Sequence, residues 1–560
     1  MFTENALENK KVLVIGLDGA TFDLLRPWAR EGKLPTLQRL MGEGAVGDLT
    51  TTIPPVSASA WTSFATGKNP GQHGLVDFVF PRRGSYQVSV ANATFRTSKT
   101  LWNLISDAGR KVGLVSVPVT YPPEAVNGFI VSSFMAPGPD SDYTYPPSLK
   151  EELRRKVGDF PLSPPEGNRS GNTERFVEDV KAFEAKRAEV VLYLLENKEW
   201  DFFAFVFETV DTLQHELWHL LDEKHPRYDP VQADLHGESI LSFYQEVDSY
   251  LARILAQADE DTMVVVMSDH GFGPFHRFFH VNNWLHQLGL LSLKKDPLSL
   301  AKYAMFQAGF TPMNILKLVT YLGLSGLRAN VKRGKSLGLL KKLFLSFSDV
   351  DWSKTKAFAV GNFGQVYINL KGKYPQGIVE PGREYEELRD RLIGEAQSLR
   401  DPQSGEKVIK RTYKKEEIFQ GKSLDRMPDL VLHTERSKYV SFGHADFGSN
   451  RVIEPSYGQT GHHSMDGILI MHGRGVKAGT SLDEAKIIDL APTILYAMGL
   501  PLPSDLEGKV LQEAFTPEFL KSHRVAYSEP PLEKEGSGRD YVGEDRERIV
   551  ERLKGLGYIA

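Results

Sequence analysis

The chain has 560 residues, of which 41% are hydrophobic and 25% are charged, and its formal net charge is −5. This composition is that of a globular protein with one large domain or several ordinary ones, and the charge gives no electrostatic case for binding a nucleic-acid duplex. The chain has no cysteine, which excludes disulfides, thiolate metal sites and a cysteine nucleophile. A metal ion would therefore need His, Asp or Glu ligands, which are typical of catalytic metal sites.

The N-terminal sequence does not have the pattern of a secretory signal. Its apolar run, residues 12–17, is short and leads directly into Asp18. No stretch approaches the roughly 20 apolar residues that a membrane-spanning helix needs. Together with the lack of disulfides, these features predict a soluble, cytoplasmic protein.

Short β-branched runs alternate with helical patterns along most of the chain. We expect strands at residues 11–17, 111–119, 201–207, 262–268 and 466–472. Apolar residues recur at three- and four-residue spacing in residues 33–43, 97–109, 175–197 and 237–258. The alternation predicts an α/β fold with a mainly parallel central sheet flanked by helices, in which ligands bind beyond the carboxyl ends of the strands.

Two segments interrupt this pattern and divide the chain into a core with insertions. We expect the catalytic core over 10–282, 351–370 and 431–512, a small α+β insertion over 371–430, and a C-terminal tail over 513–560. Residues 283–350 form a basic helical insertion, in which ten Lys or Arg stand against one acid between Ser292 and Ser346. Such an insertion commonly becomes a cap over a site. Its charge could attract an anionic substrate or an anionic membrane surface, although a solvated helical face explains it equally.

Acidic residues and histidines follow three of the predicted strands. Asp18 ends the first strand, and Asp269 with His270 ends the fourth. Asp211 and His215, beyond the third, are four residues apart and would share one face of a helix, where they could grip a cation. Each feature also has a simpler explanation: a helix cap for Asp18, a strand-end turn for Asp269, and a surface pair for Asp211 and His215.

Two further motifs lie before a helix and before a strand. Ser57 and Ser59 precede a helix that we expect to begin near Ser59 or Ala60, and the N-terminus of a helix is suited to binding phosphate. Either hydroxyl could instead cap that helix. His462 and His463 stand in a turn before the last predicted strand, and one of them is a plausible metal ligand.

Taken in order, these motifs resemble the alkaline phosphatase superfamily, and within it the type I phosphodiesterase/nucleotide pyrophosphatase family. The shared pattern is a strand ending in Asp, a Ser or Thr at a helix start, T-G-x-x-P-x-x-H-G (here residues 66–74), D-x-x-x-H, S-D-H-G-F-G and a late G-x-H. The sequence DLAPTIL, with Gly-Leu following at 499–500, is also typical of the family. The resemblance covers roughly residues 10–512 and implies an alkaline phosphatase-like fold.

The resemblance implies a site with two zinc ions and a serine nucleophile. One ion would be bound by Asp211, His215 and His463. The other would be bound by Asp18, Asp269, His270 and the hydroxyl oxygen of the nucleophile, Ser57. Manganese is an alternative metal, because His and carboxylate ligands also accept it. Ser59 replaces a proline that is usual in the family and is a second choice for the nucleophile, and His463 fits the family register better than His462.

The substrate class stays open between phosphodiester and phosphomonoester. Nucleotide pyrophosphatases often carry an Asn that contacts phosphate just beyond the H-G motif, where this chain has Asp77 and Phe78. A monoesterase usually needs a cation for the extra charge, and Lys68 and Arg277 are candidates. Two histidines at the i, i+4 spacing could bind a third metal or contact substrate; these are His276 and His280.

We therefore expect a metal-dependent phosphoric ester hydrolase that acts on a small phosphate ester or a nucleotide. The alternatives are a phosphomonoesterase, a phosphomutase or phosphotransferase of the same superfamily, or a catalytically silent binding protein with this fold. A sulfatase is disfavoured, because that chemistry modifies a Cys or Ser in a C/S-x-P-x-R context that this chain lacks. The sequence does not indicate an oligomeric state.

Overall fold

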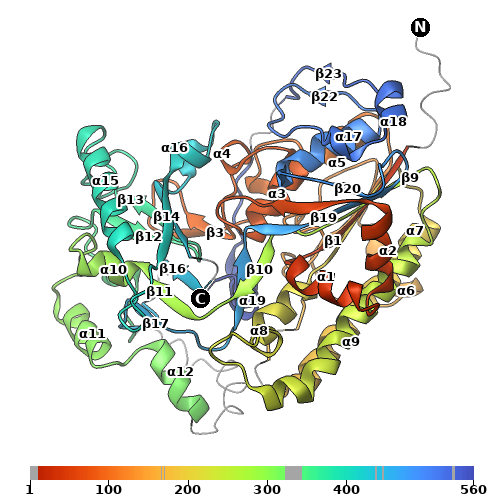
Figure 1. The fold of residues 1–560 in the computed structure, drawn as a ribbon. Helices are drawn as coiled ribbons and strands as arrows, with labels where there is room; N and C mark the ends of the chain where they lie inside the picture. Colours follow the sequence, from red (N-terminus) through yellow and green to blue (C-terminus); the bar gives the residue numbers. More distant parts are fainter. Residues whose placement is uncertain are drawn as a thin grey trace.

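The central element of the computed structural model is a ten-stranded mixed sheet (Figure 1). The structure describes residues 10–559 apart from 166, 169, 170, 322–342, 436, 437, 444–446 and 533–535. The strand order is β20 (Thr480–Ser481), β2 (Ala45–Thr50), β19 (Asp466–Gly473), β9 (Thr262–Met267), β1 (Lys11–Leu17), β8 (Phe202–Phe207), β5 (Val112–Val115), β6 (Gly128–Val131) and β7 (Thr144–Tyr145), with β21 (Ala485–Lys486) beside β2.

The five predicted strands all belong to this sheet. The central run from β9 to β6 is parallel, which confirms the mainly parallel α/β fold. The strand predicted at 466–472 differs, because β19 runs antiparallel to both β9 and β2. The beginning of β19 therefore lies beside the carboxyl ends of β9 and β1, where the other candidate residues are.

Helices cover both faces of the sheet, because its strands are apolar on both sides. Leu13, Ile15 and Leu17 of β1 pack on one face against α7 (Thr173–Asn197), α8 (Thr209–Leu221) and α9 (Pro230–Leu255). Val12 and Val14 point to the opposite face, which is covered by α3 (Ser57–Thr66), α5 (Leu101–Asp107) and α17 (Leu490–Ala497).

The four predicted helices are observed as α2 (Pro35–Glu43), α5, α7 and α9. α9 begins well before the predicted boundary, at Pro230, because the Asp229 side chain caps it by accepting hydrogen bonds from the backbone amides of Val231 and Gln232.

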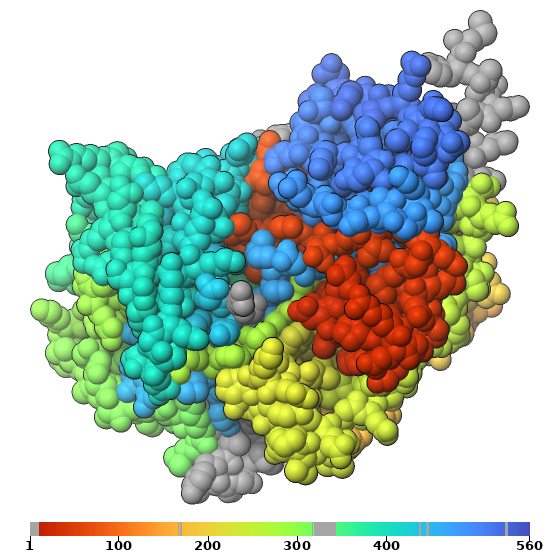
Figure 2. Space-filling view, in the orientation of Figure 1, coloured from red at the N-terminus to blue at the C-terminus, as the bar shows by residue number. Residues whose placement is uncertain are grey.

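A second, smaller sheet stands beside the main one. Its strand order is β12 (Ala357–Ala359), β13 (Gln365–Ile368), β15 (Leu430–Thr434) and β14 (Ile409–Lys414), and the predicted charged helix near 383–400 is α15 (Arg383–Ser398). The sheet thus takes strands from both sides of the predicted 371–430 insertion. In Figure 2 the surface is hollowed between this teal region and the red N-terminal helices.

The described part of the basic insertion contains most of α10 (Val281–Gln287), α11 (Pro297–Gln307), α12 (Pro312–Tyr321) and a short 3₁₀ helix, η3 (Phe347–Asp349). Two of its lysines form ion pairs: Lys302 with Asp349 at 2.9 Å, and Lys317 with Glu454 at 2.9 Å. The remaining basic residues from Arg328 to Lys342 lie outside the described residues. Nowhere in the described chain does a helix combine the length and apolarity needed to span a membrane.

The predicted C-terminal tail is folded against the core. It contains α18 (Pro517–Ser522), β23 (Tyr527–Ser528) and α19 (Gly543–Leu556), and β23 pairs with β22 (Leu502–Pro503). Residues of α19 and the segment after it belong to the same buried cluster as the small sheet. This part of the chain therefore contributes to the hydrophobic core.

We predict that Gly16→Ala lowers both stability and the integrity of the candidate site. A Cβ at Gly16 would lie 2.4 Å from Cη2 of Trp61, a buried residue of α3. Overpacking of this kind costs about 1–3 kcal/mol, which chemical denaturation would measure. Gly237→Ala in α9 is the matched control, because its Cβ would meet nothing within 4 Å and it should stabilise by about 0.5–1 kcal/mol. Equal stability of the Gly16 variant and wild type would contradict this prediction.

Candidate functional site

The candidate residues converge at one edge of the main sheet. Asp18 directly follows β1, and Asp269 with His270 follows β9, while Asp211 lies in the first turn of α8 just beyond β8. Because β19 is antiparallel, the residues before it, including His463 in β18 (Gly461–Ser464), arrive at the same edge. The loop after β2 brings Ser57 there at the start of α3.

Three of these side chains form a first group. Asp211 and His215 lie on one face of α8, with Oδ1 of Asp211 3.4 Å from Nε2 of His215. Nε2 of His463 is 3.2 Å from the same Asp211 oxygen and 3.0 Å from Nε2 of His215. All three side chains are buried, and their ligand atoms are close enough to hold one metal ion.

The second group surrounds Nε2 of His270. This atom lies 3.0 Å from Oγ of Ser57, 3.3 Å from Oδ2 of Asp269 and 3.6 Å from Oδ1 of Asp18. Asp18, Asp211 and His270 also place ligand atoms close enough together to hold an ion, so Asp211 stands between the two groups. The structure therefore brings together every residue that was predicted for the metal site.

The three histidines are all oriented by a backbone carbonyl. Nδ1 of His215 contacts the oxygen of Gly461 at 2.9 Å, Nδ1 of His463 contacts Pro55 at 2.9 Å, and Nδ1 of His270 contacts Gly271 at 3.0 Å. A carbonyl only accepts, so each Nδ1 carries a proton, and in the neutral imidazole each Nε2 then presents its lone pair to the groups. This is the arrangement in which histidine binds a metal.

In each of the three carboxylates, the two oxygens have different surroundings. One oxygen of each accepts a hydrogen bond: Asp18 from the Trp61 indole at 3.2 Å, Asp269 from the Gly19 amide at 3.2 Å, and Asp211 from the Tyr558 hydroxyl at 3.1 Å. The other oxygen of each is buried and accepts no hydrogen bond. These unpaired oxygens are the ones that face the histidines.

The electrostatics of the site favour a cation. Burial and the neighbouring Asp269 raise the pKa of Asp18 well above its usual range, and burial raises the pKa of Asp269 to about 7. Burial also lowers the pKa of His270 well below its ordinary value, which keeps its imidazole neutral. Carboxylates that are buried close together, each with one oxygen unpaired, are costly, and a divalent cation between those oxygens and the histidines would remove that cost. The donor set of Asp and His therefore fits such an ion.

The simpler explanations for these residues are not supported by the local structure. Thr21, not Asp18, caps α1 (Phe22–Arg30) by accepting from the Asp23 amide. α3 begins at Ser57, earlier than predicted, and its N-cap residue is Val56, with no side-chain cap. Neither Ser57 nor Ser59 is therefore used as a cap, and the Ser59 hydroxyl has no hydrogen-bond partner.

The candidate phosphate clamps are occupied by other partners. The Lys68 ammonium is buried against Asp505. Arg277 pairs with Asp401 at 2.9 Å and donates to Gln403. The ion pairs that the described residues make with the carboxylates of the two groups all come from histidines. Neither Lys68 nor Arg277 is placed to neutralise a phosphate at the site.

The other candidate histidines have separate environments. His280 pairs with Glu454 at 2.9 Å, whereas His276 lies with its ring 5.0 Å from that of His225, so the two do not share a partner. His73, the histidine of the 66–74 motif, accepts from the Leu75 amide at Nδ1, and its Nε2 is 2.9 Å from the Ser63 hydroxyl, so both of its ring nitrogens contact neighbours in the chain.

A cleft of about 700 Å³ opens beside His463. Phe363, β15 and β16 (Tyr439–Phe442) line one wall, and Pro54, Pro55 and Met465 line another. Three lysines and three aspartates also line it: Lys224, Lys410, Lys438, Asp23, Asp222 and Asp466. No described residue of the 283–350 insertion lines this cleft. Its volume is in the range of small-molecule sites.

Sequence reasoning missed the residues that hold the carboxylates. Trp61 and Tyr558 carry no motif that marks them, and Tyr558 reaches the site from beyond α19. Gln214 acts indirectly, because its side-chain amide donates to the Gly19 carbonyl at 2.8 Å, and the amide of Gly19 donates to Asp269. The apolar pattern of the neighbouring sequence would place these residues in the core, but it does not reveal which polar atom each of them contacts.

Two solved structures align with most of this chain. The phosphonoacetate hydrolase of Sinorhizobium meliloti 1021, in complex with phosphonoformate, superposes with a TM-score of 0.53 at 14% identity over 88% of this chain and 95% of that one. Murine ectonucleotide pyrophosphatase/phosphodiesterase 5 aligns with a TM-score of 0.48 at 14% identity over 90% of this chain and 100% of that one. The first of these supports the fold.

Human arylsulfatase K is 36% identical over 64 residues, a stretch that covers only 11% of this chain and 12% of that protein. Residues 12–466 match the family described as type I phosphodiesterase/nucleotide pyrophosphatase, a region that contains all seven candidate site residues. The chain belongs to the type I phosphodiesterase/nucleotide pyrophosphatase family, a family of phosphoric ester hydrolases.

Proposed function

We propose that the protein hydrolyses phosphodiesters with Ser57 as the nucleophile and two divalent metal ions, zinc in the first instance and manganese as the alternative. The observation that carries this proposal is the set of three buried, unpaired carboxylate oxygens facing three histidine Nε2 atoms, one of which, that of His270, lies 3.0 Å from the Ser57 hydroxyl. Such a set of oxygen and nitrogen donors suits divalent cations and has no evident structural purpose without them.

The two groups divide the ligands between the two ions. Asp211, His215 and His463 would hold one. Asp18, Asp269 and His270 would hold the other, together with the Ser57 hydroxyl oxygen. When bound, the ions lower the pKa of the Ser57 hydroxyl and neutralise charge on the phosphoryl oxygens.

The start of α3 prepares Ser57 for attack on phosphorus. Val56 supplies no side-chain cap, and the first amide bonded within the helix is that of Ala60, to the Val56 carbonyl at 2.8 Å. The amides at the beginning of the helix are therefore available to phosphoryl oxygens, with the positive end of the helix dipole behind them. A bond forms between Oγ of Ser57 and phosphorus as the bond to the leaving-group oxygen breaks. Water then cleaves the seryl ester and restores the hydroxyl.

The charge around the site favours a diester over a monoester. A diester carries one negative charge on its phosphate and a monoester carries up to two, so a monoesterase needs an additional cation. Lys68 and Arg277 are committed to Asp505 and Asp401 and do not supply it. The three lysines of the cleft beside His463 are matched by three aspartates, so the cleft adds no excess of positive charge for a doubly charged phosphate.

We predict that the metal-loaded protein hydrolyses bis-p-nitrophenyl phosphate faster than p-nitrophenyl phosphate. Ser57→Ala should lower kcat/KM for the diester by at least about 10³-fold, because it removes the nucleophile. Ser59→Ala is the matched control and should retain activity, since the Ser59 hydroxyl has no partner in either group. Release of p-nitrophenolate measures both.

Three results would contradict this assignment. Loss of activity in the Ser59 variant, with activity retained in the Ser57 variant, would show that Ser59 is the nucleophile. Faster turnover of the monoester would favour a phosphomonoesterase. Cleavage of neither ester, with metal bound, would favour a phosphomutase or phosphotransferase.

We predict that divalent metal raises the melting temperature of chelator-treated protein. A ligand at 100 times its Kd stabilises the native state by about 2.7 kcal/mol per site, and here it would also relieve the repulsion among the buried carboxylates. Asp211→Asn should remove most of this rise, because Asp211 contributes to both groups. Asp466→Asn, a change of the same kind in the cleft wall, should keep it. An absence of any rise in the wild-type protein would exclude the metal site.

A further inference from the structure

The segment that follows α19 enters the candidate site from outside the main sheet. Gly557 ends the helix with φ +89°, a left-handed conformation that favours glycine, and directs the next residue inward. Tyr558, 7% exposed, lies with its ring 4.6 Å from that of Phe78 and 5.8 Å from that of Phe134. Its hydroxyl is thereby brought to the metal-ligand groups.

The Tyr558 hydroxyl contacts one of the two carboxylate oxygens of Asp211. It donates to Oδ2 at 3.1 Å, while Oδ1 of the same carboxylate faces Nε2 of His215 and Nε2 of His463. Trp61 and Gly19 make the equivalent contacts with Asp18 and Asp269. Of these three donors, only Tyr558 comes from a segment outside the sheet and its covering helices.

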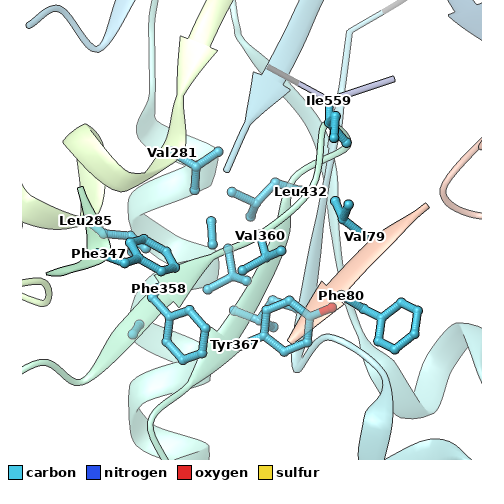
Figure 3. Close-up of a cluster of buried hydrophobic side chains, with 14 of the residues drawn as sticks. Val79, Phe80, Val281, Leu285, Phe347, Phe358, Val360, Tyr367, Leu432 and Ile559 are labelled. Carbon is cyan, nitrogen blue, oxygen red and sulfur yellow. The ribbon is translucent and has the colours of Figure 1, made fainter. Parts of the chain in front are cut away.

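Several independent contacts hold the segment in place. The Asn362 side chain donates to the carbonyls of Gly557 and Tyr558, the latter at 2.8 Å. Arg552 of α19 donates to the carbonyls of Phe134 and Ala136. Ile559 lies in the same buried cluster as Val79 and Leu432, as Figure 3 shows. The position of the Tyr558 ring is thus fixed by packing and by hydrogen bonds on both sides.

We propose that Tyr558 is a positioning residue that directs Oδ1 of Asp211 towards the metal, and that residues 543–559 are a working part of the catalytic centre. This inference rests on the proposed function. A carboxylate with one oxygen fixed by a buried donor has lost the freedom to rotate, so its other oxygen is held ready as a ligand. Without the phenol hydroxyl, the Asp211 side chain would be free to rotate. Both metal-ligand groups would then lose the carboxylate oxygen that they share.

The test is the affinity of the chelator-treated full-length protein for zinc, measured by competition with a chromophoric chelator. Tyr558→Phe keeps the ring packing and removes only the hydroxyl, and we expect it to weaken zinc binding by about 10–100-fold. Tyr541→Phe, two residues before the start of α19, is the matched control. It also removes a buried hydroxyl, one that donates to the Met135 carbonyl at 2.7 Å, and should leave zinc affinity unchanged.

A second variant addresses the placement of the ring. Gly557→Ala keeps the hydroxyl but strains the left-handed turn and places a Cβ 2.0 Å from Nε2 of Gln459. It should weaken zinc binding as Tyr558→Phe does, because it moves Tyr558 away from Asp211.

The possible outcomes separate this inference from the proposed function. Unchanged zinc affinity in Tyr558→Phe would overturn the inference while leaving hydrolysis by the wild-type protein intact. Tighter zinc binding would also overturn it, since the phenol would then compete with the metal for Asp211. If Tyr558→Phe weakens zinc binding as expected but the wild-type protein cleaves no ester, the inference stands and the proposed hydrolysis fails. A wild-type protein that binds no zinc would overturn both.

Discussion

The structure of this protein depends on how three buried carboxylates are tolerated at one edge of a sheet. Asp18, Asp211 and Asp269 lie close together where water is largely excluded, and their mutual repulsion opposes folding. Each carboxylate is anchored by one donor and leaves one oxygen to the histidines. The strands, the loop after β2 and the segment after α19 all end at this point, and among the described residues no Lys or Arg forms an ion pair with these three carboxylates.

The parallel core of the fold could be predicted from the sequence, and so could the meeting of the candidate residues at one edge of its sheet. Uninterrupted β-branched runs mark strands that are buried on both faces, and the residues after them are placed together by the topology of a parallel sheet. That reasoning holds for Asp18, which follows β1, and for Asp269 and His270, which follow β9. The order of the motifs along the chain then indicated the family, and the structure brings all seven candidate residues together.

Other features could not be predicted because they depend on long-range contacts. The direction of β19 has no signature in its own sequence, since apolar runs look alike in parallel and antiparallel strands, yet it is what delivers His463 to the site. The strands of the small sheet come from before, within and after the predicted 371–430 insertion. Their pairing therefore depends on contacts between residues that are far apart in the sequence. Lys68 and Arg277 were reasonable phosphate clamps until their partners Asp505 and Asp401 were known.

The antiparallel course of β19 has a consequence for how the protein is made. Asp18, Ser57, Asp211 and Asp269 leave the ribosome long before His463, and the contacts among them span most of the sequence. A nascent chain that has emerged only as far as β9 can pair its central strands but has neither β19 nor the imidazole that precedes it. Closing such distant contacts is slow relative to local helix formation. The proposed set of metal ligands is therefore complete only late in biosynthesis, after most of the strands of the sheet have emerged.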